Sequence, residues 1–377
     1  MKNSNPVNVP YSARQARLAE VMSKSGFDCI ALNPGPSLMY LTGLNFHLME
    51  RPVVALFLPG GSPILILPRL EAPKLEALPY ALRAFPYNEK PSEWPVVFQN
   101  AIQAAGIGKS KVGVEPTRLR FLELKMLEHA APGGSFISAE QSLAALRMYK
   151  DESEVAIMQT AVDIAQRGLQ ATLPAIKPGV SEREIAAELM LQLLRAGGDP
   201  EAAFSPIVSG GPNSANPHAS PSERLIQSGD LLVIDWGASY HGYISDLTRT
   251  FAIGQVEPEF TQIARIVAEA NAAGRAAAGP GVAASLVDKA ARDVIERAGY
   301  GAYFFTRVGH GIGMEVHEEP YIRAGNPLIL QPGMAFTIEP GIYLTGRNGV
   351  RVEDNVVITP TGINCLSDLP RELRVLG

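Results

Sequence analysis

The stretch LLVIDWGASYHGYISDLTRTF, residues 231–251, contains two apolar runs joined by a short polar turn. The first run ends on Asp235, and Asp246 opens the second. A turn at Tyr240 and His241 predicts an antiparallel hairpin that sets the two aspartates directly opposite each other. Residues in that relation share a face of the sheet, so we expect their carboxylates to point the same way.

A second hairpin is predicted in AFTIEPGIYLTGRNGVRVEDNVVI, residues 335–358. Here a turn between Gly346 and Gly349 places Glu339 on one strand opposite Glu353 on the next. Four carboxylates are therefore expected to converge from two hairpins.

The two hairpins belong to a longer internal repeat. KPGVSEREIAAELMLQLLRAGG (177–198) resembles GPGVAASLVDKAARDVIERAGY (279–300), with an offset of 102 residues. QSGDLLVID (227–235) resembles QPGMAFTIE (331–339), with an offset of 104 residues. Two agreeing offsets predict two related halves, each a helix followed by a hairpin, around a pseudo-twofold axis.

The chain upstream of the repeat has a different character. Between residues 11 and 146, amphipathic helical segments alternate with short apolar strands that end at Pro or Gly, which is typical of an α/β layer. The acidic segment RMYKDESE (147–154) then opens a long helical pattern. We therefore predict a smaller α/β domain over residues 1–146 and an α+β domain over residues 147–377, as the length of 377 residues also favours two cores.

Composition narrows the classes of function. With 46% hydrophobic and 19% charged residues the chain is typical of a globular protein. A net charge of −5 without a clustered basic face argues against nucleic acid as a partner. The chain's two cysteines, Cys29 and Cys365, do not make a disulfide scaffold, and no apolar run reaches the roughly 20 residues that cross a bilayer. The start of the chain is polar and contains two prolines. We therefore expect a cytoplasmic enzyme that does not reside in a membrane.

Four converging carboxylates favour a metal site. Like charges that face one interior repel each other and lose hydration unless cations lie among them. His310, between Gly309 and Gly311, is the fifth candidate ligand, because glycine neighbours let the backbone come close. One imidazole with four carboxylates suits manganese, cobalt, iron or zinc, and bridging carboxylates can hold two such ions. The sequence contains no His-Glu-x-x-His motif of the zincin type.

The order and spacing of these five residues resemble the pita-bread metallopeptidases, in the aminopeptidase P and prolidase branch. The set is Asp235, Asp246, His310, Glu339 and Glu353, at separations of 11, 64, 29 and 14 residues. Further motifs of this resemblance are NPH (216–218), SDLTRT (245–250), GHGIGMEVHEEP (309–320), EPGIY (339–343) and RVED (351–354). The resemblance is strong over residues 147–360, and the N-terminal domain fits the creatinase/prolidase type in length and layout.

The resemblance implies an exopeptidase with two divalent ions per chain, manganese first among the possible metals. Its substrates would be small peptides with proline at the second position, cut at the Xaa-Pro bond. Both Xaa-Pro aminopeptidase and Xaa-Pro dipeptidase activity fit this implication, and so does a homodimer.

The resemblance also implies roles for residues around the metals. His218 and His317 would line the substrate site and donate hydrogen bonds to the scissile carbonyl as it becomes an oxyanion. Glu339 would take a proton from the attacking water and pass it to the leaving imino nitrogen.

Two further residues are expected to steady the ligands. Residues two apart on a strand face the same way, so Arg351 should accompany Glu353 and Thr248 should accompany Asp246. Each can fix a ligand carboxylate by a hydrogen bond.

Substrate length depends on recognition of a carboxylate after proline, for which arginine is the natural partner. Prolidases often carry an arginine directly after the His-Glu-x-Pro segment, but Tyr321 stands there in this chain. Arg323 and Arg347 are the nearby substitutes, with an ordinary solvated loop charge as the alternative interpretation of each. The departure favours a peptidase that accepts tripeptides and longer chains as well as dipeptides.

Other functions remain open at this stage. The same fold and metals serve the carbon–sulfur cleavage of dimethylsulfoniopropionate lyases. Creatinase-like hydrolases lack the metal ligands that are intact here, and non-catalytic pita-bread binding modules have lost ligands or carry basic surfaces. Methionine aminopeptidases usually lack the N-terminal domain.

Overall fold

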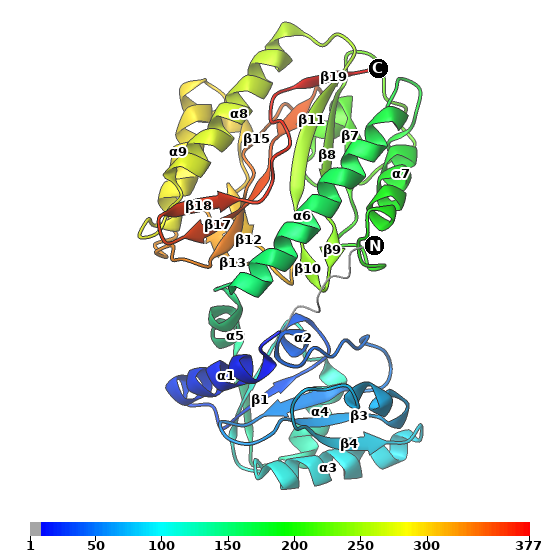
Figure 1. The fold of residues 1–377 in the computed structure, drawn as a ribbon, viewed down its shortest axis with the longest axis vertical. Coiled ribbons are helices and arrows are strands. Elements are labelled where there is room, and N and C mark those ends of the chain that lie inside the picture. The colour runs from blue at the N-terminus through cyan, green and yellow to red at the C-terminus, as the bar shows by residue number, and fades with distance from the viewer. Residues whose placement is uncertain (1–8) are drawn as a thin grey trace. The chain divides into compact units, whose positions relative to one another are not determined.

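The computed structural model describes residues 9–377, which fold into two compact units (Figure 1). The first unit ends at Arg147 and the second begins at Met148. The division lies one residue beyond the boundary drawn from the sequence.

The first unit is built on a six-stranded mixed sheet with strand order β4-β3-β2-β1-β5-β6. Its strands are β1 (Cys29–Leu32), β2 (Val54–Phe57), β3 (Ile64–Pro68), β4 (Arg83–Tyr87), β5 (Lys111–Val114) and β6 (Ser135–Ser138). Its helices are α1 (Tyr11–Ser25), α2 (Pro36–Thr42), α3 (Trp94–Ala105), α4 (Phe121–Ala130) and α5 (Glu140–Arg147). β1, β2 and β3 are buried throughout, as their continuous apolar runs require. The predicted α/β layer is present.

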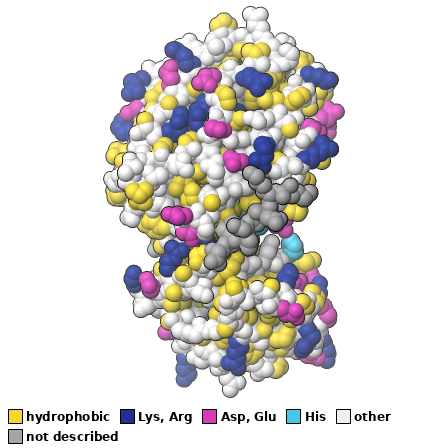
Figure 2. All heavy atoms as spheres, viewed as in Figure 1, with side chains coloured by type: hydrophobic (Ala, Val, Ile, Leu, Met, Phe, Trp, Pro, Cys, Tyr) yellow, Lys and Arg dark blue, Asp and Glu magenta, His cyan; other side chains and the backbone are white. Residues whose placement is uncertain are grey.

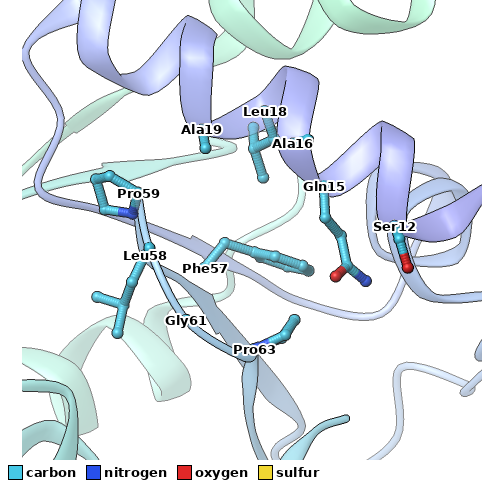
Figure 3. A pocket seen from close by; sticks show the side chains of 11 residues that line it. Ser12, Gln15, Ala16, Leu18, Ala19, Phe57, Leu58, Pro59, Gly61 and Pro63 are labelled. Atoms are coloured by element: carbon cyan, nitrogen blue, oxygen red, sulfur yellow. The ribbon is translucent and has the colours of Figure 1, made fainter. Parts of the chain in front are cut away.

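A hollow of about 240 Å³ lies between α1 and the turn that joins β2 to β3 (Figure 3). Gln15 lines it and donates a hydrogen bond to the carbonyl of Leu41 at 2.9 Å. The rest of its lining is small or apolar, with Phe57 at the centre of the view, and includes no titratable side chain. The side chains that line the hollow therefore include no acid, base or charged metal ligand.

The second unit repeats one pattern twice. Its helices are α6 (Glu152–Thr172), α7 (Glu182–Arg195), α8 (Pro258–Ala277) and α9 (Ala284–Arg297). The first half contributes β7 (Ile207–Gly210), β8 (Leu231–Trp236), β9 (Ser239–Tyr240), β10 (Tyr243–Ile244) and β11 (Leu247–Ile253). The second half contributes β12 (Gly309–Gly311), β13 (Glu318–Ile322), β14 (Ala335–Ile338), β15 (Gly341–Tyr343), β16 (Gly349–Arg351), β17 (Asp354–Thr359) and β18 (Gly362–Cys365), and β19 (Arg374–Leu376) returns to the first sheet. Short 3₁₀ turns cover Arg69–Leu75, Pro91–Glu93, Leu173–Ala175, Gly211–Ala215 and Gly301–Tyr303.

The strands form two larger sheets, one four-stranded, β19-β11-β8-β7, and one five-stranded, β13-β12-β14-β17-β18, and two short two-stranded sheets, β10-β9 and β15-β16. In Figure 1 the helix pair α6 and α7 lies on one side of these strands and the pair α8 and α9 on the other. Backbone contacts repeat as well, since Gly179 N donates to Ile226 O at 2.9 Å and Gly281 N donates to Leu330 O at 2.8 Å. The internal repeat predicted from the sequence is therefore confirmed.

The first hairpin turns one residue later than the sequence suggested. His241 and Gly242 occupy the turn with φ of 49° and 77°. Positive φ at both central residues is what a two-residue type I′ hairpin requires, and glycine supplies the second position without strain. The partner of Asp235 is therefore Thr248, and the predicted pairing with Asp246 is wrong. The shift in partner is two residues, which keeps both aspartates on one face.

The second hairpin has the predicted register. β14 pairs with β17 and β15 pairs with β16 along the alignment that sets Glu339 opposite Glu353. Both glutamates lie in short interruptions between these strands.

On the face shown in Figure 2, lysine and arginine side chains are dispersed among acidic and apolar ones. Among the described residues, no helix combines the length and apolar character needed to cross a bilayer.

Candidate metal centre

Five predicted ligands meet where the two sheets of the second unit adjoin. Asp235 lies in β8, Asp246 just before β11, His310 in β12, Glu339 after β14 and Glu353 before β17. His310 Nε2 is 3.2 Å from Glu339 Oε1 and 3.6 Å from Asp246 Oδ2. One ligand atom from each of Asp246, His310 and Glu353 lies within 4.8 Å of the others. Residues that are far apart in the sequence thus lie together in the structure.

Three carboxylate oxygens of this cluster are buried without a hydrogen-bond partner. They are Asp235 Oδ1, Asp246 Oδ1 and Glu353 Oε1. Such orphaned acceptors are rare in folded proteins, because the hydration that they lose is not replaced. Divalent cations prefer oxygen ligands of this kind, so the residues present fit a metal centre.

The electrostatics of the cluster differ from one carboxyl to the next. Burial, and then the neighbouring carboxylates, raise the pKa of Asp246 and of Glu353 well above the ordinary range. Burial also raises the pKa of Asp235, although Arg351 opposes the effect. Burial acts in the same direction on Glu339, but a hydrogen bond with His310 and its charge outweigh it, so the pKa of Glu339 is lowered. Bound cations would favour the ionised form of all four.

Both units of the chain match models of known protein families. The model of metallopeptidase family M24 matches residues 156–360. The chain belongs to metallopeptidase family M24. The creatinase/prolidase N-terminal domain matches residues 14–149, so the predicted combination of a creatinase-type domain with a pita-bread domain is confirmed.

Relatives of this M24 chain match it over nearly its whole length. The probable dipeptidase PepE of Mycobacterium tuberculosis is 39% identical over 373 residues, 97% of this chain and 96% of the relative. The Xaa-Pro dipeptidase of Lactobacillus helveticus is 33% identical over 361 residues, 96% of this chain and 98% of the relative. The crystal structure of the prolidase from Thermococcus sibiricus has a TM-score of 0.91 at 35% identity and covers 97% of this chain and 99% of its own. These three relatives are named as dipeptidases or as a prolidase.

Arg351 and Thr248 both contact carboxylates of the M24 cluster, but not the predicted ones: Arg351 binds Asp235 instead of Glu353, and Thr248 binds Glu353 instead of Asp246. Arg351 donates from Nη2 to Asp235 Oδ2 at 2.6 Å and from Nε to Thr248 Oγ1 at 3.0 Å. Thr248 Oγ1 in turn donates to Glu353 Oε2 at 2.7 Å. A single chain of hydrogen bonds therefore links an aspartate of the first half to a glutamate of the second.

Two residues that contact this M24 centre had no role assigned to them from the sequence, Asn355 and Tyr343. Asn355 Nδ2 donates to the carbonyl of Asp246 at 2.7 Å, and Asp246 N donates to Asn355 Oδ1 at 3.0 Å. Tyr343, which ends the EPGIY motif, accepts a hydrogen bond at its hydroxyl from Arg351 Nη1 at 3.0 Å. The motif marked Tyr343 as part of the resemblance, but no pattern pointed to Asn355, whose contact joins the two sheets.

Glycine is required on both sides of His310 in the M24 domain. A Cβ on Gly309 would lie 1.9 Å from the carbonyl oxygen of Thr337, and one on Gly311 would lie 2.3 Å from the backbone of Glu319. β12 therefore fits between β13 and β14 only without those side chains.

The two predicted substrate histidines occupy different environments in the M24 domain. The rings of His317 and His310 make an edge contact with centroids 4.1 Å apart. Burial, then the charges of His310 and Arg307, lower the pKa of His317 to about 4, and His218 contributes in the same direction. His317 is therefore neutral at pH 7. His218 is exposed, and its backbone N–H donates to Asn216 Oδ1 at 3.2 Å.

The structure does not bring the two predicted carboxylate-binding arginines into the M24 cluster. Arg323 is exposed and donates only to the carbonyl of Ala324, at 3.4 Å. Arg347 forms ion pairs of 2.8 Å with Glu257 and with Glu259, at the start of α8. Both residues were chosen because they lie near the histidine motif in the sequence. That closeness does not determine which groups their side chains contact.

Proposed function

We propose that this chain is a metal-dependent Xaa-Pro dipeptidase. The observation that carries the proposal is the buried cluster of four carboxylates and one imidazole, with three carboxylate oxygens that lack any protein partner. The names of the relatives, a probable dipeptidase, an Xaa-Pro dipeptidase and a prolidase, support the choice of substrate.

Two divalent ions are the proposed cofactors, with manganese first and cobalt, zinc or iron as alternatives. The residues that would hold them are Asp235, Asp246, His310, Glu339 and Glu353. His310 Nδ1 is 3.1 Å from the carbonyl of Gly311, which can only accept, so Nδ1 carries a proton and Nε2 faces the carboxylates. Ions in this oxygen-rich site would supply Lewis acidity and make water a stronger acid, with a pKa of ~7.

Glu339 transfers the proton, and two histidines donate hydrogen bonds to the substrate. Glu339, with its lowered pKa, is ionised at neutral pH and accepts a proton from the attacking water. It delivers that proton to the nitrogen of the leaving proline. His317 is neutral and can donate a hydrogen bond to the carbonyl oxygen as that oxygen becomes negative, with His218 as the second donor.

Proline explains why a dedicated enzyme is needed. Its nitrogen carries no hydrogen once it is in a peptide bond, and its ring fixes φ. A site shaped for that ring accepts a bond that ordinary peptidases handle poorly. A homodimer in the cytoplasm remains the expectation for the assembled enzyme.

The test uses manganese-reconstituted enzyme with Ala-Pro, Ala-Ala and Ala-Pro-Ala in parallel. We expect hydrolysis of Ala-Pro, a much lower kcat/KM for Ala-Ala and for Ala-Pro-Ala, and loss of all turnover after chelation. Hydrolysis of Ala-Ala as fast as Ala-Pro, or no hydrolysis of any peptide by metal-loaded enzyme, would contradict the proposal.

A further inference from the structure

The recognition of the substrate's C-terminal carboxylate is the open question of a dipeptidase site. Arg351 cannot serve, because its guanidinium is already shared among Asp235, Thr248 and Tyr343. Arg347 is held in ion pairs at α8, and Arg323 is exposed. An arginine that has no anion and is held in place is therefore sought in another segment.

Arg307, three residues before His310, is such an arginine. It is half-buried, and its guanidinium lies 4.8 Å from the ring centroid of Tyr321. Within residues 9–377, no carboxylate lies within ion-pair distance of Arg307 and no hydrogen bond engages its side chain. A guanidinium that is partly removed from water and lacks an anion is able to bind one from outside.

The backbone on both sides of Arg307 is fixed. The carbonyl of Thr306 accepts a hydrogen bond from Arg292 Nη2 at 2.9 Å. Val308 N donates to the carbonyl of Ile322 at 3.1 Å, and the carbonyl of Val308 accepts from Glu339 N at 2.6 Å. The neighbours of Arg307 are thus hydrogen-bonded to α9, to β13 and to the backbone of Glu339. Such pre-organisation lowers the entropy lost when a ligand binds.

The position of Tyr321 strengthens the argument. Tyr321 follows the HEEP segment, where an arginine would be expected in a prolidase, and in this chain its ring stacks against the guanidinium of Arg307. The positive charge therefore lies beside that position but comes from the segment before β12. Tyr321 lies in β13, which pairs with β12, the strand that carries His310.

We propose that Arg307 binds the C-terminal carboxylate of the Xaa-Pro dipeptide and thereby sets the preference for dipeptides. The planar guanidinium matches a carboxylate with two parallel hydrogen bonds, and Tyr321 holds the plane in place. The inference rests on the proposed dipeptidase function, because a longer peptide has no carboxylate at that place.

The experiment compares Ala-Pro with its C-terminal amide, Ala-Pro-NH₂, on manganese-loaded enzyme and on Arg307→Gln. In the original enzyme, Ala-Pro should have the higher kcat/KM. Arg307→Gln should lower kcat/KM for Ala-Pro about 10- to 100-fold, mostly through KM, as expected for a lost hydrogen-bonded charge pair. The same change should leave kcat/KM for the amide within about twofold.

Two controls make the result specific. Arg323→Gln removes an exposed arginine after the same HEEP segment and should leave kcat/KM unchanged for both substrates. Arg307→Lys keeps the positive charge but not the two parallel N–H donors of the guanidinium. Its kcat/KM for Ala-Pro should therefore lie between those of the original enzyme and Arg307→Gln. The melting temperature and bound manganese of Arg307→Gln should equal those of the original enzyme.

Equal losses on Ala-Pro and on its amide would overturn the inference while leaving the dipeptidase function intact, because Arg307 would then act through Glu339 or His317. Failure of the metal-loaded original enzyme to hydrolyse either substrate would overturn the proposed function and this inference with it.

Discussion

The two hairpins of the M24 domain come from one repeat but carry the metal ligands in different ways. In the first, Asp235 lies inside β8, paired with Ile207 of β7 on one side and with Thr248 of β11 on the other. In the second, Glu339 and Glu353 lie where the strands are interrupted. A regular ladder thus positions Asp235, whereas Asp246 and both glutamates lie where strands are interrupted.

The helices and first strands of the halves differ as well. α7 begins with a capping box formed by Ser181 and Glu184, whereas α9 begins after Ala283 without a side-chain cap. Ile207 of β7 corresponds by the repeat offset to Gly309 of β12. The two halves therefore share a fold but differ in their helix caps and in how their strands carry the ligands.

The largest expected effect tests the glycine requirement of the second half. Gly309→Ala should destabilise the protein by roughly 3 kcal/mol or more, at or above the upper end of ordinary overpacking, because its Cβ would meet the backbone of Thr337. Thermal and urea unfolding measure it. Gly279→Ala, where the added methyl meets open space, is the control and should be close to neutral. A Gly309→Ala protein as stable as its parent would show that β12 can move away.

The next effect concerns the buried ion pairs of Asp354, which join the second half to Arg249 of the first. Asp354 accepts from Arg249 Nη2 at 2.9 Å and from Arg371 Nε at 2.7 Å, whereas Thr250 stands at the corresponding place in the first half. Burial raises the pKa of Asp354, but Arg249 and then Arg371 outweigh it and lower the pKa below the ordinary value. The stabilisation should be present above pH ~4, the unfolded pKa, and be lost as the pH falls through the folded one.

Asp354→Asn should therefore lose roughly 3–5 kcal/mol of unfolding free energy at pH 7, since Arg249 would remain buried and unpaired. The difference from the parent should shrink as the pH falls below about 4, measured by urea unfolding across pH. A difference that is constant between pH 7 and pH 3 would contradict this assignment.

The proposed substrate histidines should affect turnover rather than metal binding. His317→Ala and His218→Ala should each lower kcat about 10²- to 10³-fold, because each removes a donor to the developing oxyanion. Metal content by elemental analysis should stay at the parental level. If either variant loses metal while its fold is intact, the assignment of that histidine to the substrate is wrong.

A smaller effect should come from the hydrogen bond that links the halves. Thr248→Val removes the hydroxyl between Arg351 and Glu353 and should weaken metal affinity about 10- to 100-fold. Thr160→Val, on α6, is the matched control and should leave affinity unchanged. Competition with a metal-binding dye measures both. Unaltered affinity in Thr248→Val would mean that Arg351 alone orients the ligands.

Much of this site was predictable because metal ligands keep a fixed order along the chain. The register of the second hairpin followed from its turn glycines, and the repeat offset predicted the partner half. The predicted register of the first hairpin was wrong, because the type I′ turn at His241 and Gly242 depends on backbone φ values. The alternation of apolar residues does not determine these values.

The choice among arginines was not predictable, for a related reason. Arg323 and Arg347 lie close in sequence to the histidine motif, yet the side chain of one is exposed and that of the other is paired at α8. Arg307 reaches Tyr321 only because β12 packs on β13, with glycines that allow the approach. Contacts between strands that are distant in sequence decide such cases.

The most direct test of the account is the metal content of the M24 centre and its dependence on both hairpins. Protein stripped with chelator and reconstituted with saturating manganese should contain two ions per chain by elemental analysis. Asp235→Asn, in the first hairpin, and Glu353→Gln, in the second, should each hold fewer ions while they keep the parental fold by circular dichroism. A centre that stays empty under saturating manganese, cobalt and zinc, or that keeps both ions in both variants, would contradict a metal site shared by the two halves.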